Sequence, residues 1–144
     1  MAVVSPLGHG NRDVLAVLED PEDQVRIAAL KALGNIGSEA AKRIVMDKIM
    51  DDSFKEKEFG EKKDYFEVIS KWKDNEVFDF LSGIIKKKTF FRNTKNDENR
   101  ACAAYSLGLL GNREALQILH RYRNESSKLI KEFTVSAIRR LEHE

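Results

Sequence analysis

The sequence predicts an all-α protein, a right-handed α–α superhelix in which about four helix pairs stack into a short solenoid. Three observations predict this fold. Segments 23–44 and 97–118 match position by position, which is an internal repeat. Apolar residues recur at the spacing of one helix face, and residues that can cap helices recur at one repeat position. No stretch alternates convincingly between apolar and polar residues, so we expect no β-strands.

The copies of the repeat differ in how well they match. Alignment of the two best copies pairs Arg26 with Arg100 and Gly34 with Gly108. A weaker copy lies between them, and a partial copy follows the third. Successive copies lie roughly 30–40 residues apart, a spacing that suits repeats of two helices each. We therefore expect a single domain over residues 1–144, with units near 11–35, 38–73, 75–110 and 112–141.

Each unit is expected to form a helix, a turn and a second helix. In the first unit, Asp20 and Pro21 form a helix start, because a proline in the first helical position loses no intrahelical hydrogen bond. The helix after them carries an apolar stripe from Val25 to Ile36. The complete set of predicted helices is 11–19, 22–35, 38–51, 61–73, 75–88, 97–110, 112–122 and 127–141.

The later units repeat these signals. Ser38, Asp74 and Asn112 stand just before a helix, where their oxygens can accept hydrogen bonds from free backbone N–H groups. Apolar stripes run through 77–85 and 130–141. Four glycines are expected to mark the points where a helix ends and the chain turns: Gly34, Gly37, Gly108 and Gly111.

Two runs of sequence carry a family resemblance. DQVRIAALKALGNIG at 23–37 and DENRACAAYSLGLLG at 97–111 resemble HEAT-like repeats of the phycobilisome-lyase type. The stretch 54–119 also resembles the C-terminal HEAT segments of larger bacterial proteins, which raises the possibility that the chain is a fragment or a stand-alone relative of such a module. The resemblance implies the same stack of helix pairs.

The resemblance also implies a ladder of charges between neighbouring repeats. The ladder residues would be Asp23 with Arg26 and Asp97 with Arg100, which match the family motif. Lys62 takes the arginine position in the second unit, so we expect the ladder to be interrupted there. A minority alternative is that these arginines bind a ligand.

Composition excludes several classes of protein. The chain has 144 residues, 25 Lys and Arg against 24 Asp and Glu, and one cysteine. One cysteine excludes a disulfide framework and a cysteine-based zinc site. No apolar run approaches the roughly 20 residues that a membrane span needs, so we expect no membrane partner and a cytoplasmic location.

The sequence offers no motif for catalysis. His9, His120 and His143 are scattered and have no metal-ligand spacing. Cys102 lies on an inward alanine-rich stripe, which favours a buried apolar role over a reactive thiol. We therefore expect no catalytic residue, cofactor or metal. The favoured function is a non-catalytic protein–protein interaction or scaffold module, and an enzyme is the least favoured of three classes.

The partner is expected to be a protein or peptide that binds the face of the second helices. The spacing puts charged or aromatic side chains from every unit on that face, and the mixture of charges suits a protein better than a nucleic-acid duplex. The candidate residues are Lys31, Glu67, Lys71, Tyr105 and Arg140. An ordinary solvated helix face is the alternative for any one of them.

Nucleic-acid binding through the basic segment 86–95 is the alternative function. This segment, KKKTFFRNTK, has aromatic residues among its cations and no acidic residue. Residues 1–52 carry 6 basic and 9 acidic groups, whereas residues 53–95 carry 11 and 8. The plainer interpretation is a helix end whose cations complement the helix dipole. The cations of this basic segment are Lys86, Lys87, Lys88, Arg92 and Lys95.

Overall fold

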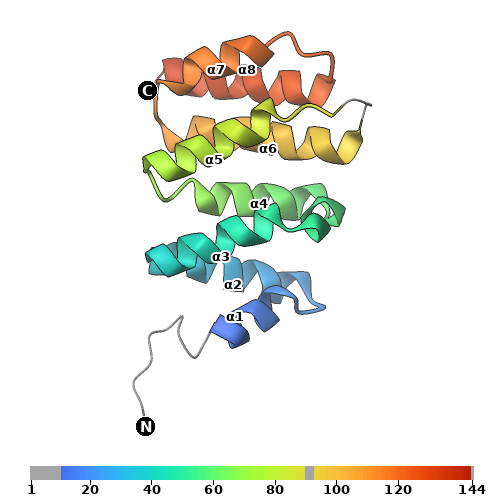
Figure 1. Cartoon of the computed structure of the whole chain (residues 1–144), viewed down its shortest axis with the longest axis vertical. Helices are drawn as coiled ribbons and strands as arrows, with labels where there is room; N and C mark the ends of the chain where they lie inside the picture. The colour runs from blue at the N-terminus through green and yellow to red at the C-terminus, as the bar shows by residue number, and fades with distance from the viewer. Residues whose placement is uncertain (1–10, 90–92, 144) are drawn as a thin grey trace.

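The computed structural model describes residues 11–89 and 93–143, and these residues form eight α-helices and no strand (Figure 1). The predicted all-α fold is confirmed. A short 3-10 helix, η1, covers Asp52–Glu56 between the third and fourth helices. The α-helices are α1 (Asn11–Leu18), α2 (Asp23–Ile36), α3 (Glu39–Met50), α4 (Phe59–Ile69), α5 (Asn75–Lys86), α6 (Thr94–Leu110), α7 (Ala115–Tyr122) and α8 (Lys128–Glu142).

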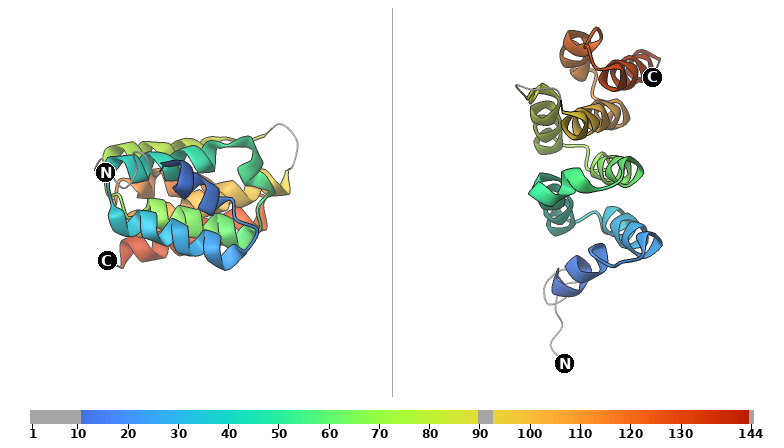
Figure 2. Two further views of the ribbon diagram at one scale, coloured as in Figure 1. Left: turned by 90° about the horizontal axis from the view of Figure 1, so that it is seen from below. Right: turned by 90° about the vertical axis from the view of Figure 1, so that its right-hand side faces the viewer.

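The helices lie in two layers, as the right-hand view of Figure 2 shows. The first helices of the pairs, α1, α3, α5 and α7, form one layer, and α2, α4, α6 and α8 form the other. Within the second layer, α4 packs against α2 and α6, and α6 packs against α8. Each first helix also packs against the second helix of its own pair. Among the described residues, no helix is long and apolar enough to cross a lipid bilayer.

Capping chemistry starts α3 and α5 and ends α2 and α6 where the repeat pattern predicts. The predicted cap at Asn112 is displaced, because α7 begins at Ala115 and Asn112 accepts from the N–H of Glu114 before it. The side chains of Ser38 and Asp74 accept hydrogen bonds from the N–H groups of Ala41 and Val77 at the starts of α3 and α5. Gly37 and Gly111 follow α2 and α6 in the left-handed conformation, with φ of 68° and 80°. A side chain with a Cβ rarely adopts this conformation, so these two turns favour glycine.

Gly34 and Gly108 have a different role from the predicted one, because both lie inside a helix. A Cβ on Gly34 would be 3.1 Å from a methyl carbon of Val68 on α4. A Cβ on Gly108 would be 3.0 Å from the Cβ and 3.1 Å from the Cα of Ala137 on α8. These glycines permit close contact between successive helices of the second layer.

The core runs continuously between the two layers. Tyr65 and Phe66 of α4 are almost fully buried, and Phe54 of η1 contacts both rings edge to face. Cys102 is fully buried in α6, and burial raises the pKa of its thiol to about 12. The thiol is therefore protonated at neutral pH, in agreement with an apolar packing role.

The charge ladder exists, but its acidic members are glutamates rather than the predicted aspartates. Arg26 of α2 forms an ion pair of 2.8 Å with Glu61 of α4, not with Asp23. The same hydrogen-bonded pair lowers the pKa of the Glu61 carboxyl below its ordinary value. Arg100 pairs with Glu125 at 3.1 Å, not with Asp97, and also donates to the backbone oxygen of Ile85. The motif does not contain these partners because they lie 25 or more residues further along the chain.

The predicted interruption of the ladder at the second unit is wrong. Lys62 is completely buried, and its ammonium lies 2.8 Å from the carboxylate of Glu98 on α6. Lysine therefore replaces arginine without loss of the cross-repeat ion pair. Lys42 makes a similar link in the first layer, because its buried ammonium contacts Asp74 and Glu76 at the start of α5.

Replacing Gly108 by alanine should destabilise the stack. The added methyl group would meet Ala137 at 3.0 Å, and both its Cα and Cβ are in the way. We expect the free energy of unfolding to fall by about 1–3 kcal/mol. Urea denaturation followed by circular dichroism measures this change. Gly60→Ala is the control, because a Cβ there meets no atom within 4 Å, and equal behaviour of the two variants would contradict the proposed close contact.

Removing the cation of Arg100 should be more costly. Arg100 is 2% exposed, so Arg100→Met would leave Glu125 partly buried and without its guanidinium. We expect a loss of about 3 kcal/mol in the free energy of unfolding. Lys131→Met is the control, because Lys131 holds the equivalent position in the last unit and is exposed. Similar urea midpoints for Arg100→Met and the unmodified chain would show that the ladder does not stabilise the stack.

Candidate functional site

The predicted partner-binding residues lie along the second layer, but the structure brings only some of them together. The hydroxyl of Tyr105 on α6 donates a 2.7 Å hydrogen bond to Glu67 on α4. Arg140 on α8 lines a pocket with Tyr105. Lys31 on α2 and Lys71 after α4 do not line this pocket. Lys71 instead lies over Gly34, where its Cδ fills the space that a Cβ would need.

The pocket at Tyr105, which we call the Tyr105 pocket, has a volume of about 330 Å³ and lies between α4, α6 and α8. The ammonium of Lys63 lies 4.8 Å from the centre of the Tyr105 ring and 6.0 Å from that of Phe133. The two rings meet edge to face, with their centres 6.3 Å apart. The sequence does not single out Lys63 or Phe133 as binding residues. Phe133 belongs to the apolar stripe of residues 130–141, and Lys63 is one of many charged helix residues.

In the Tyr105 pocket the phenol has a hydrogen-bond partner, whereas the two cations have no ion-pair partner among the described residues. Burial, followed by the hydrogen bond to Glu67, raises the pKa of Tyr105 to about 12, so the phenol keeps its proton at neutral pH. Burial also raises the pKa of the nearby Asp64 carboxyl. Within the described residues, neither Lys63 nor Arg140 forms an ion pair. Two cations next to aromatic rings are therefore available to a ligand.

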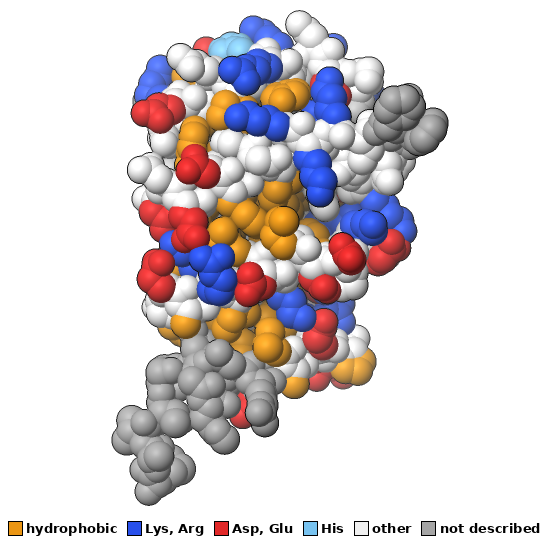
Figure 3. Space-filling view, in the orientation of Figure 1, with side chains coloured by type: hydrophobic (Ala, Val, Ile, Leu, Met, Phe, Trp, Pro, Cys, Tyr) orange, Lys and Arg blue, Asp and Glu red, His pale blue; other side chains and the backbone are white. Residues whose placement is uncertain are grey.

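The basic segment 86–95 does not form one cationic patch among its described residues. Lys88 lies 3.5 Å from Glu125, and Lys95 contacts Glu56. Lys86 is in the last turn of α5, as the helix-end interpretation expects, and Lys87 follows it. Arg92 lies outside the described residues. On the face shown in Figure 3, cations and acids are interspersed rather than separated.

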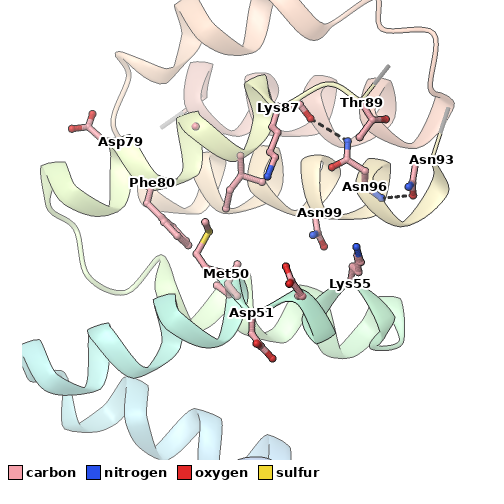
Figure 4. A pocket seen from close by; sticks show the side chains of 14 residues that line it. Met50, Asp51, Lys55, Asp79, Phe80, Lys87, Thr89, Asn93, Asn96 and Asn99 are labelled. Carbon is pink, nitrogen blue, oxygen red and sulfur yellow. Dashed lines mark hydrogen bonds between the residues drawn. The ribbon is translucent and has the colours of Figure 1, made fainter. Parts of the chain in front are cut away.

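A larger pocket, not predicted from the sequence, opens on the face shown in Figure 3. It has a volume of about 520 Å³ and lies between α3, η1, α5 and the start of α6 (Figure 4). We call it the α3–α5 pocket. Its apolar side includes Met50 and Phe80, and its polar side includes Lys55, Lys87 and Asn99. No local motif signals it, because its lining comes from segments up to fifty residues apart in the sequence.

Metal-ligating residues are dispersed in the described part of the chain. No group of three or more His, Cys, Asp or Glu side chains there could hold a metal ion. His120 lies in α7, His143 follows the end of α8, and His9 falls outside the described residues.

Comparison with known proteins identifies the repeat and one enzyme of similar fold. Residues 13–40 match the HEAT repeat family. No curated protein matches the chain. A solved structure of human deoxyhypusine hydroxylase in complex with glycerol is similar over 96% of this chain, with 25% sequence identity and a TM-score of 0.68. The match covers 47% of the hydroxylase chain, so the present chain spans about half the length of that enzyme.

These findings confirm a HEAT-like fold and correct the predicted function. The helix pairs form the HEAT-like α–α superhelix that the repeat pattern predicted. The prediction of a non-catalytic scaffold, and with it the prediction that the chain is not an enzyme, is contradicted by the similarity to a hydroxylase. The similarity to the enzyme covers almost all of the present chain. The fold therefore gives no ground for excluding catalysis.

Proposed function

We propose that this chain recognises a polypeptide substrate in an enzymatic reaction, and that the Tyr105 pocket holds part of that polypeptide. The similarity to a hydroxylase supports the enzymatic setting. The observation that carries the proposal is the pair of cations, Lys63 and Arg140, beside the rings of Tyr105 and Phe133.

The chemistry of the pocket selects a segment in which an acidic residue adjoins an apolar or aromatic one. A carboxylate would pair with Lys63 or Arg140, which have no acidic partner within the described residues. An apolar side chain of the peptide would pack on the rings of Tyr105 and Phe133, which themselves pack edge to face. Each contact alone is weak, but a peptide that makes both is anchored at two points.

The surroundings of the pocket favour a polypeptide over a nucleic acid. Two cations and one acid, Glu132, line the pocket, so it can pair with a single carboxylate but offers no continuous positive track for a phosphate backbone. Lys31 on α2 and Lys71 after α4 belong to other units of the same layer. A peptide that crosses from α8 towards α2 would therefore meet these lysines after it leaves the Tyr105 pocket.

We also propose the finer family assignment and setting. The runs 23–37 and 97–111 support repeats of the phycobilisome-lyase type in a bacterial protein. The single cysteine, which is buried and free, supports a cytoplasmic site of action.

Changes in the Tyr105 pocket should weaken peptide binding. The probe is a fluorescent heptapeptide that alternates glutamate and phenylalanine, and fluorescence anisotropy measures its Kd. We expect Tyr105→Ala and Arg140→Glu each to raise the Kd by about fivefold or more, which corresponds to about 1 kcal/mol. Arg121→Glu, an exposed charge reversal on α7 in the other layer, should leave the Kd within about twofold.

A second peptide tests the sign of the charge. In this peptide lysine replaces every glutamate, and we expect it to bind more weakly than the acidic one. Equal binding of the two peptides, or equal Kd values for Arg140→Glu and Arg121→Glu, would contradict the proposal. Thermal denaturation of each variant confirms that a change in Kd does not arise from unfolding.

A further inference from the structure

We propose that the α3–α5 pocket binds a free α-amino acid with an apolar side chain. The proposal does not depend on the Tyr105 pocket, which lies between the second helices in the other layer. The argument rests on how the pocket arises, on its two unlike sides, and on polar groups within it that have no partner in the described residues.

The pocket lies between the first-layer helices α3 and α5, where the flexible side chain of Met50 and the glycine Gly83 leave space. Gly83 in the middle of α5 lines the pocket, and a Cβ there would meet no atom within 4 Å. A glycine inside a helix costs up to about 1 kcal/mol relative to alanine, so this position leaves space at the expense of helix stability. Across the gap, Met50 at the end of α3 is 62% exposed, more than any other large apolar side chain in the described residues.

The apolar side of the pocket can hold a hydrocarbon group. Figure 4 shows Phe80 of α5 and Met50 of α3 directed toward each other across the opening. Ile49 and Ile84 continue this surface. A patch of apolar side chains is also visible between α3 and α5 in Figure 3. An aromatic or branched side chain placed here would remove Met50 and Phe80 from water.

Two ammonium groups lie on the polar side. Lys55 comes from η1 and Lys87 from the residue after α5, and both line the pocket (Figure 4). Neither forms an ion pair within the described residues, although Lys57, Lys62, Lys88 and Lys95 nearby all do. Two cations without an ion-pair partner in the described residues thus line this side, and either ammonium can pair with a carboxylate.

The same side also needs a hydrogen-bond donor. The side-chain oxygen of Asn99 is buried and has no hydrogen-bond partner among the described residues. Such an oxygen costs free energy until a donor reaches it. The neighbouring Asn96 donates from its amide to the backbone oxygen of Lys87 at 3.1 Å and makes no hydrogen bond to the Asn99 oxygen. An α-ammonium group, which is one bond from the carbon that bears the carboxylate, would supply the missing N–H.

Three aspartates set the remaining electrostatics. Asp51 accepts a hydrogen bond from the Ser53 hydroxyl, which lowers the pKa of its carboxyl. Asp79 is directed away from the opening in Figure 4. Asp52 lines the pocket and would repel a simple carboxylate but attract an ammonium group. With Asp79 directed away, Asp51 and Asp52 balance the two lysines, and this balance suits a zwitterion better than a simple anion.

Binding of L-phenylalanine, measured by isothermal titration calorimetry on the full chain, tests the proposal. 3-Phenylpropionate lacks the ammonium group and phenethylamine lacks the carboxylate, so we expect each to bind at least about tenfold more weakly. Lys87→Gln should raise the Kd for L-phenylalanine about fivefold or more. Lys86→Gln, which changes the adjacent lysine outside the pocket, should leave the Kd unchanged.

Filling the pocket provides an independent test. Gly83→Phe should abolish binding, and the open space around its Cβ allows the fold to persist. Gly60→Phe is the matched control, because Gly60 is equally unobstructed and lies outside the pocket. Tighter binding of phenethylamine than of L-phenylalanine would overturn the proposal, as would unchanged binding to Gly83→Phe or Lys87→Gln. Absence of heat with L-phenylalanine at 10 mM, on the order of the weakest affinity expected of a specific site, would also overturn it.

Discussion

The structure depends on charged side chains that are buried where one helix pair meets the next. Lys62 is completely buried and contacts Glu98 in the following pair, and the half-buried Arg26 contacts Glu61 of the pair after its own. A buried ammonium without its carboxylate costs several kcal/mol, so a pair of helices that slipped along its neighbour would lose more than apolar contacts. These ion pairs therefore fix the register of the stack, whereas apolar burial alone would tolerate small displacements.

The same use of charge determines which surfaces remain available to ligands. Cations at the repeat boundaries form ion pairs with acids of the next helix pair, as Lys42 does with Asp74 and Glu76. Lys63 stands next to Lys62 in the sequence, but it points to the surface of the second layer and lies over Tyr105 instead. Adjacent lysines thus differ in role: Lys62 joins two helix pairs, and under the proposed function Lys63 contacts the ligand. Composition shows only that the total charge is nearly balanced.

Sequence predicts the features of this fold that are local and misses those that link distant segments. The helices follow from apolar spacing, and Ser38 and Asp74 cap them as expected because a cap involves residues three positions apart. The partners of Arg26 and Arg100 lie 35 and 25 residues away, and a motif does not contain them. The turn predicted at Gly34 is wrong because the close approach of α4 is invisible in the sequence of one helix. The α3–α5 pocket escapes prediction for the same reason, since its cations come from η1 and from the end of α5.

Helix α6 contributes to both proposed sites, yet its packing argues that they act independently. Its first turns supply Asn99 to the α3–α5 pocket, and Tyr105 lies less than two turns further on at the other pocket. Just beyond Tyr105, α6 is held on both sides. Ser106 donates to the backbone oxygen of Phe66 at 2.7 Å, and Gly108 lies against Ala137 without room for a methyl group. These contacts tie α6 to α4 and α8, and coupling between the two sites would require α6 to adopt a second arrangement that breaks them. Ligands at the two pockets should therefore meet a rigid element rather than a switch.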